Sequence, residues 1–370
     1  MRRVLVVRLR SIGDTVLATP SLIALKRFLP AAQIDVLLED WVTPLLEGFD
    51  AVDNILTVRK GPRSRFETAW QIRRNKYDVV FNLHGGTTGT FFTFASGATH
   101  RVGYLEYQYS FLYNHLLSSA SNFWQKETAH SAEQQLALLG FVGVPVEDRP
   151  KSRLTVTGNA SNSLRKKFNV EAERIRDSNE SLPYVCFDDY GPRNSQSEFV
   201  LFHPAAAFAT KQWAPENFAR TAEFLYEKGL GAIAVAARNE RDMLERLQSD
   251  SRVPVRIFDD RSLPEITALA SKAKLFVGND SGIAHIAAAV GTPTVVIFGS
   301  SNINHWRPWT DAPNEIIYEK LPCQPCSGYI CREFGAPKCI QTVSVPRVTA
   351  AIERVLAETK RRRDFTPAVV

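Results

Sequence analysis

The chain has 370 residues, of which 44% are hydrophobic and 23% charged, and its formal net charge is +6. This composition is typical of a folded globular chain, and the length predicts two domains. No apolar run is long enough to span a bilayer. The segment from Val4 to Val7 is too short for the core of a secretory signal and is followed at once by Arg8, so we expect a cytoplasmic protein. The positive charge favours anionic partners such as phosphates, acidic sugars or a membrane surface.

Strands alternate with helical segments in the first part of the chain. The apolar run Arg2 to Leu9 predicts a buried strand, and the next twenty residues predict a turn and a helix that Pro20 kinks or divides. Gly13 and Asp14 fall at that turn, where an acid is most often an ordinary charge at a helix N-terminus. This alternation predicts a parallel sheet with right-handed crossovers. Further strands are predicted at Ile34 to Asp40, Asn54 to Lys60 and Tyr77 to Gly86, with a helix near Val42 to Phe49.

A basic segment, KGPRSRFETAWQIRRNKY, separates the third and fourth predicted strands. Its cations could form one positive lip that contacts an acidic substrate, although a solvated helix face is the more common outcome. The aromatic side chains between Gly103 and Leu117 could stack a sugar or a base, but tyrosines at this density more often cover the side of a core. The cations of the segment are Lys60, Arg63, Arg65, Arg73, Arg74 and Lys76.

Regular periodicity fades between Lys151 and Glu198, where charged, Gly, Pro and Ser residues indicate a connection between domains. One strand is predicted inside it, at Tyr184 to Phe187. We therefore expect a first domain over residues 1–175, a linker over 176–198, a second domain over 199–344 and a final helix with a basic tail over 345–370.

The α/β pattern restarts at Phe199. A strand leads into a loop that holds His203, Lys211 and Trp213, and Pro215 is predicted to start the next helix. A second strand ends in a polar turn with Glu240. After a third strand, Ser262 and Glu265 have the spacing of a capping box.

The stretch from Leu275 to Ser301, LFVGNDSGIAHIAAAVGTPTVVIFGSS, predicts a strand, a turn, an Ala-rich helix and another strand. Asp280 or Ser281 suits the N-cap, and Gly282 would let an anion approach the helix amides. An ordinary capped helix would read the same way. Polar groups that follow strands could meet in one cleft between two sheets; they are Asp14, Lys211, Glu240, Asp280 and Ser281.

Four segments together resemble the ADP-heptose:lipopolysaccharide heptosyltransferases of glycosyltransferase family 9. They are VVRLRSIGDTVLATPSL, FHPAAAFATKQWAPENFA, the NER turn at Asn239 to Arg241, and VGNDSGIAHIAAAVGTPTVVIFGSS. The resemblance implies an α/β protein of the GT-B fold, with two Rossmann-like domains facing across a central cleft. It also implies inverting transfer of heptose from ADP-heptose to the inner core of lipopolysaccharide, onto Kdo-lipid A or a heptosyl acceptor, without a catalytic metal.

Roles for individual residues follow from the same resemblance. Asp14 matches the catalytic base, and Lys211 matches the cation that meets the diphosphate, whose charge the amides around Ser281 and Gly282 would share. Asp280 and His285 would order the loop or touch the donor, and Glu240 could hold a ribose hydroxyl. The first domain would bind the acceptor, with Arg63, Arg65 and Arg73 as candidates. The final helix would cross back to that domain, and its basic end could touch an anionic membrane, where the lipid acceptor lies.

Two features depart from this scheme or stand beside it. Ala205 to Ala207 occupy a loop where relatives often carry Gly, Ser or Thr, which weakens the case for side-chain contacts to the donor there. A cysteine cluster, CQPCSGYICREFGAPKC, suits a structural zinc or another metal, or else free or redox-linked thiols, because its spacing is not that of a zinc ribbon. The cluster consists of Cys323, Cys326, Cys331 and Cys339, whereas Cys186 stands apart.

Two other classes of function remain open at this point. A nucleotide-sugar epimerase or hydrolase of the same fold would use the donor cleft without an acceptor, but the basic lip argues against it. A non-enzymatic anion- or nucleic-acid-binding protein could use the cysteine cluster and the basic tail from Lys360 to Phe365. Two Rossmann-like halves with polar strand ends would then have no purpose, so we expect no nucleic-acid partner.

Overall fold

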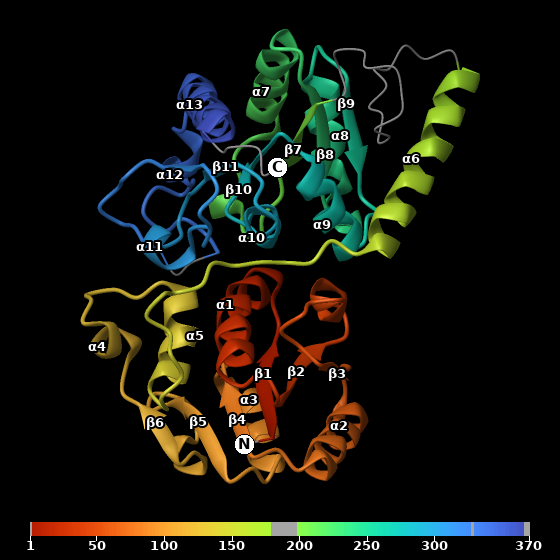
Figure 1. Ribbon diagram of the computed structural model, residues 1–370. Coiled ribbons are helices and arrows are strands. Elements are labelled where there is room, and N and C mark those ends of the chain that lie inside the picture. The colour runs from red at the N-terminus through yellow and green to blue at the C-terminus, as the bar shows by residue number, and fades with distance from the viewer. Residues whose placement is uncertain (1, 179–197, 327–328, 366–370) are drawn as a thin grey trace. The chain divides into compact units, whose positions relative to one another are not determined.

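A computed structural model describes residues 2–178, 198–326 and 329–365 of the chain. The chain divides into two compact units, Met1–Thr155 and Val156–Val370. Each unit is built around one six-stranded parallel sheet (Figure 1). The fold class predicted from the alternation of strands and helices is therefore confirmed.

The sheet of the first unit has the strand order β3-β2-β1-β4-β5-β6. β1 lies at its centre because Val4, Leu5, Val6 and Val7 are apolar on both faces and fully buried. Helices α2 and α3 cover one face, where Ile72 and Phe92 share a core with Leu5 and Val7; α1 packs against α5. The strands are β1 Arg3–Leu9, β2 Gln33–Glu39, β3 Asn54–Val58, β4 Val79–Asn82, β5 His100–Tyr104 and β6 His115–Leu117; the helices are α1 Ile12–Phe28, α2 Pro62–Asn75, α3 Gly86–Ala95, α4 Ala120–Trp124 and α5 Ser131–Gly140.

The sheet of the second unit has the order β12-β11-β10-β7-β8-β9. Counted from β7, this is the 3-2-1-4-5-6 arrangement of a doubly wound fold, and the first unit has the same order. Helices α7, α8 and α13 bury their apolar faces in one core with Phe202, Trp213 and Ile352. The strands are β7 Phe199–His203, β8 Gly231–Val235, β9 Val255–Phe258, β10 Leu275–Asn279, β11 Thr294–Ile297 and β12 Asn314–Ile317; the helices are α6 Gly158–Ser178, α7 Pro215–Glu227, α8 Arg241–Asp250, α9 Leu263–Lys272, α10 Gly282–Ala289, α11 Ile303–Trp306, α12 Lys338–Gln341 and α13 Val345–Phe365.

Helix α1 continues through Pro20, so the expected division of this helix is wrong. A proline inside a helix leaves the carbonyl four residues earlier without its amide donor. Here the Thr19 hydroxyl donates to that carbonyl, on Val16, at 2.7 Å. The side chain next to the proline therefore replaces the lost backbone hydrogen bond.

The boundary between the two units lies about twenty residues earlier than the predicted end of the first domain at residue 175. Helix α6 has an apolar stripe in which Ala160, Leu164 and Phe168 are buried at intervals of four residues. The many charged residues around this stripe make it hard to detect in the sequence. Helix α6 packs against α9 of the second unit (Figure 1), and the ring of Phe168 meets that of Phe258 edge to face at 5.2 Å. Most of the predicted linker, and the strand predicted at Tyr184 to Phe187, lie outside the described residues.

Other differences are local. The helix expected near Val42 to Phe49 is a short 3-10 turn, Thr43–Leu46, and strands β5, β6 and β12 were not predicted. Helix α13 packs on α7, β11 and β12 of its own unit, so its crossing to the first unit stays a prediction. Among the described helices, none combines the length and apolarity that a membrane crossing requires.

Candidate functional site

Asp14 lies at the carboxyl end of β1, in the first turn of α1. Its Oδ1 is 2.6 Å from Nη2 of Arg8, and its Oδ2 accepts a hydrogen bond of 2.8 Å from the Ser11 hydroxyl. Arg8 is 7% exposed and also donates to the carbonyl of Leu83, the residue that follows β4. Both carboxylate oxygens of Asp14 thus have fixed partners, and the side chain is held at the edge of the sheet.

The backbone leaves β1 through a strained residue. Leu9 has φ +59°, a left-handed conformation that costs a residue with a branched side chain about 1–2 kcal/mol. The β1–β2 register shifts at the same point. This conformation turns the chain from the sheet toward Ser11 and Asp14, and such strain is found most often at functional sites.

His84 follows β4 at the same edge of the first sheet. Burial, together with the smaller effect of the positive charges of Arg8 and Arg10, lowers its pKa to about 4, although the carboxylates of Asp14 and Glu39 partly oppose this shift. The imidazole is therefore neutral at pH 7. Next to it, the amides of His84 and Gly85 donate to Oδ1 of Asn82 at 3.0 Å, which orders the glycine-rich turn before α3.

The second unit gathers three polar side chains at the carboxyl ends of β10 and β11. Nζ of Lys211 lies 2.8 Å from Oδ2 of Asp280, and the Ser301 hydroxyl donates to the same oxygen at 2.5 Å. Asp280 is 6% exposed, and the side chain of Lys211 is 19% exposed. The carboxylate thus fixes the position of a lysine whose ammonium group is still partly open to solvent.

Asn279 and Gly299 explain why the loop that carries Lys211 lies here. The buried amide of Asn279 accepts from the Trp213 amide at 3.1 Å and donates to the Pro204 carbonyl at 2.7 Å. A Cβ atom on Gly299 would lie only 2.1 Å from the carbonyl oxygen of Thr210. The loop therefore needs the amide side chain of Asn279 at the end of β10 and a glycine at position 299, two residues after β11.

Helix α10 begins beside Lys211 and Asp280. Ser281 is its N-cap residue. Among the described residues, the Ser281 side chain makes no capping hydrogen bond to the first amides of the helix. The Ser281 hydroxyl instead lies 3.1 Å from Nδ1 of His203 at the end of β7. Burial lowers the pKa of His203 to about 4, so this ring is neutral at pH 7. The first amides of α10 and the positive end of its dipole thus lie next to a lysine, an arrangement suited to a diphosphate.

Two other predicted donor contacts have structural partners. Oε2 of Glu240 accepts from the Ala237 amide at 3.0 Å and so closes the turn after β8. His285 is 4% exposed within α10. This burial fits the expectation that His285 orders the loop better than a direct contact with a ligand.

The predicted basic lip is not one cluster. Arg63 is exposed and pairs with Glu67 at 2.8 Å, and Arg65 lines a cavity between α2 and α3. Arg73 begins the last turn of α2, where its guanidinium lies over Gly97. The helix spaces these cations over about three turns, so they do not converge on one point.

The four clustered cysteines line one small cavity together with Thr210 and Ser300. The amide of Cys326 donates to the Ser300 carbonyl at 2.9 Å, so this loop braces the strand end that carries Ser301. Burial raises the pKa of the Cys326 and Cys339 thiols. Across the described ranges, no three Cys, His, Asp or Glu side chains are placed to hold a metal ion, so the thiols as placed do not fit a metal.

Sequence reasoning missed Arg8 and Ser301, which hold the two central carboxylates. A buried arginine in an otherwise apolar strand was the available signal for Arg8, because buried charges are normally paired. Ser301 gave no signal, since a serine after a strand is common in loops.

The fold and these two strand-edge clusters define a two-domain protein of the GT-B class. The model of glycosyltransferase family 9 (heptosyltransferase) matches residues 65–336. The chain belongs to this family. Lipopolysaccharide heptosyltransferase 3 of Escherichia coli K12 is 24% identical over 371 residues, which cover 94% of this chain and 96% of that protein.

Two solved structures have the same fold. A family 9 glycosyltransferase from Veillonella parvula aligns with a TM-score of 0.77 and 18% identity, covering 96% of this chain and 97% of that one. The ADP-heptose lipopolysaccharide heptosyltransferase II of E. coli aligns with a TM-score of 0.75 and 19% identity, covering 97% and 100%.

Proposed function

We propose that this chain transfers heptose, with inversion, from ADP-heptose to an acceptor in the inner core of lipopolysaccharide. The observation that carries the proposal is the pairing of Lys211 with Asp280 beside the N-terminus of α10. Family membership supports the class of reaction, and a relative that covers nearly the whole chain supports the choice of sugar and acceptor.

Lys211 and the first amides of α10 would bind the diphosphate of the donor. When the bond between the sugar and the diphosphate breaks, negative charge grows on the departing ADP, and fixed cations and dipoles stabilise that charge without reorganising. Asp280 and Ser301 would keep Lys211 in place. Glu240, after β8, would hold a ribose hydroxyl with its carboxylate.

Asp14 would act as the general base. It would take the proton of the acceptor hydroxyl while that oxygen attacks the anomeric carbon from the side opposite to ADP. Arg8 and Ser11 fix both oxygens of this carboxylate, so its orientation needs no adjustment when the acceptor arrives. Arg63, Arg65 and Arg73 remain the candidates for acceptor contacts, and the cleft between the two domains remains part of this proposal.

The proposed chemistry uses no metal. Zinc at the four cysteines would be a structural ion, although the described thiols are not arranged as ligands. Elemental analysis of the purified chain tests whether the four cysteines hold zinc. About one zinc per chain would show that they do, and metal-free protein with reactive thiols would show that they do not. A lipid acceptor would also bring the chain to the cytoplasmic surface of the inner membrane as a peripheral protein.

Calorimetry tests the donor half of the proposal. ADP-heptose and ADP should bind, UDP-sugars should bind far more weakly, and Lys211→Ala should raise the Kd for ADP about ten- to a hundredfold. Lys228→Ala is the matched control, because Lys228 is a partly exposed lysine of the same unit, paired with Glu353 at 2.7 Å. Tight binding of UDP-sugars with no response to ADP would contradict the proposal.

A transfer assay tests the acceptor half. Asp14→Ala should leave ADP binding unchanged and abolish transfer of heptose to a lipid A core acceptor. Hydrolysis or epimerisation of the nucleotide sugar without transfer would instead favour an enzyme that needs no acceptor.

A further inference from the structure

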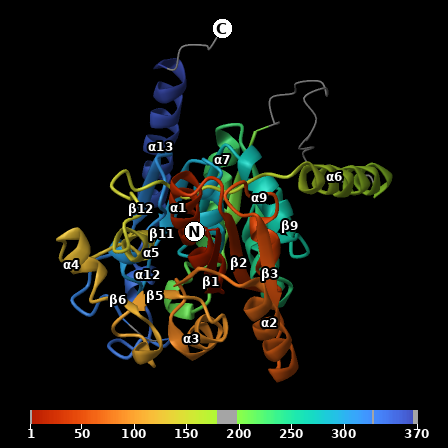
Figure 2. The same cartoon turned by 60° about the horizontal axis from the view of Figure 1, so that its bottom comes forward.

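Helices α2 and α3 of the first unit present four aromatic side chains to solvent. The two helices lie side by side in Figure 2 and contact each other. Phe66 and Trp70, one turn apart on α2, are 69% and 63% exposed, and Phe91 and Phe94 on α3 are 38% and 56% exposed. The rings of Phe66 and Phe91 meet edge to face at 6.4 Å. We call these four residues the aromatic face.

The aromatic face is not required for the core of its own unit. The buried sides of the same helices, with Ala69 and Ile72 on α2 and Phe92 on α3, already fill the space above the sheet. Single exposed aromatic residues are common, but a group of them on adjoining helices is typical of a surface that binds a protein, a membrane or a ligand.

The charge around the aromatic face is concentrated. Residues 59–76 hold seven Lys or Arg residues and one acid, which gives this segment a net charge of +6, equal to the formal net charge of the whole chain. The remaining 352 residues are therefore neutral in sum. Within this segment the guanidinium of Arg74 lies 4.4 Å from the centre of the Trp70 ring, so positive charge and aromatic surface are interleaved.

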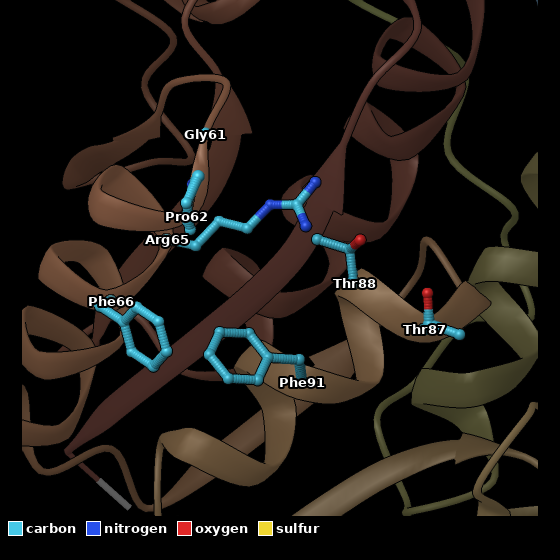
Figure 3. Close-up of a pocket in the computed structure, with 7 residues that line it drawn as sticks. All are labelled: Gly61, Pro62, Arg65, Phe66, Thr87, Thr88 and Phe91. Carbon is cyan, nitrogen blue, oxygen red and sulfur yellow. The ribbon is translucent and has the colours of Figure 1, made fainter.

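A cavity of about 550 Å³ opens between the two helices. Figure 3 shows the rings of Phe66 and Phe91 next to each other on one side of this cavity, while the Arg65 side chain extends from α2 toward Thr88 on α3. Its lining consists of Gly61, Pro62, Arg65, Phe66, Thr87, Thr88 and Phe91. One wall is thus apolar and the other offers a cation and hydroxyl groups, which suits an amphiphile with an anionic end.

We propose that the aromatic face and the cations of residues 59–76 dock this chain on an anionic phospholipid bilayer. The rings would enter the boundary between headgroups and acyl chains, where tryptophan is enriched. The cations would meet lipid phosphates at the surface, and the cavity would admit part of one lipid. The inference rests on the proposed function only for its purpose, which is to bring the enzyme to a lipid acceptor.

The charge distribution argues against a second copy of the chain as the occupant. Two such faces would bring two segments of charge +6 together, and like charges at an interface are unfavourable. A bilayer that contains anionic lipid offers the opposite sign over an extended flat area. An acidic protein could do so as well, and a chain that fails to bind anionic vesicles in the experiment below would favour that alternative over a bilayer.

Co-sedimentation of the full chain with vesicles tests the proposal. The chain should bind phosphatidylcholine vesicles that contain about a third phosphatidylglycerol, should bind pure phosphatidylcholine far more weakly, and should be released by high salt. The paired change Arg74→Gln with Lys76→Gln should lower the partition coefficient about 25-fold, since each basic residue contributes about fivefold. Phe66→Ser with Trp70→Ser should lower it at least about tenfold.

Matched controls keep both losses interpretable. Tyr109→Ser with Phe111→Ser removes another exposed aromatic pair of the same unit, whose rings lie 6.2 Å apart, and should leave binding unchanged. Lys360→Gln with Arg361→Gln removes the same charge from the exposed end of α13. Equal unfolding temperatures of all variants exclude misfolding as the cause of a loss.

Three outcomes would overturn the proposal. The first is vesicle binding that does not depend on the anionic lipid. The second is a loss of binding in the α13 variant alone, and the third is a dimer in sedimentation velocity that the changes at Phe66 and Trp70 dissociate. Binding is measured without a nucleotide sugar. Vesicle binding without heptose transfer to a soluble acceptor would thus contradict the proposed function alone, and transfer without vesicle binding would contradict this inference alone.

Discussion

Lys211 and Asp280, 69 residues apart in the chain, form an ion pair of 2.8 Å at the carboxyl ends of the central strands of the second sheet. Neither side chain acts alone there, because Ser301 donates to the same carboxylate oxygen. If Lys211 meets the diphosphate, then Asp280 contributes by holding that lysine rather than by touching the anion.

A double-mutant cycle on ADP binding follows from this relationship. Asp280→Ala alone should weaken ADP binding, because Lys211 loses its anchor. The double change Lys211→Ala with Asp280→Ala should bind no more than about threefold more weakly than Lys211→Ala alone, because contacting residues couple by roughly 0.5–3 kcal/mol. Calorimetry on the four proteins measures this. Additive losses would show that Asp280 contacts the ligand independently of Lys211.

The two fixed oxygens of Asp14 lead to a graded prediction for catalysis. Asp14→Asn should lower kcat about a hundred- to ten-thousandfold, the usual contribution of a general base. Ser11→Ala removes only one orienting hydrogen bond, and should lower kcat a few-fold, corresponding to about 1 kcal/mol. Both variants should bind ADP as the unchanged chain does. A Ser11→Ala loss as large as that of Asp14→Asn would contradict a purely orienting role.

The close approach of Gly299 to the Thr210 carbonyl predicts a loss of stability. Gly299→Ala should lower the free energy of unfolding by about 1–3 kcal/mol, because the added carbon requires the loop or the strand end to move. The same change should weaken ADP binding, since Lys211 follows Thr210 directly. Gly158→Ala is the control, because a Cβ there meets nothing within 4 Å. Chemical denaturation and calorimetry on both variants test the pair.

Glu265 predicts how acid acts on the contact between α6 and α9. Burial alone would raise its pKa, but hydrogen bonds from Lys167, the Ser262 amide, and the Ser163 and Ser262 hydroxyls lower it to about 2. A depressed carboxyl pKa stabilises the fold above the unfolded value near 4.5, and this stabilisation is lost as the pH falls toward about 2.

Comparison with Glu265→Gln tests that prediction. At pH 7 the variant should be less stable by roughly 2 kcal/mol, and the difference should shrink between pH 4.5 and 2. Denaturation at several pH values measures it. A difference that stays constant with pH would mean that shape, not ionisation, makes Glu265 important.

Much of the fold could be predicted because its signals are local. Apolar runs of strand length, separated by helical segments, define a parallel sheet whichever residues fill it, and a capping box such as that of Ser262 and Glu265 involves neighbours in the chain. Helix α6 escaped this reasoning, since Leu164 and Phe168 are few among charged residues and their partner, Phe258, lies ninety residues away.

The candidate site divides in the same way. The sequence by itself determined that Asp14, Lys211, Asp280 and Ser281 follow strands, because motif and spacing are properties of the chain. Only the tertiary structure decided that Arg8 holds Asp14, that Ser301 and Lys211 share one oxygen of Asp280, and that the rings of α2 and α3 adjoin. Those relationships join residues brought together by strand order, which depends on the packing of the whole sheet and not on any one segment.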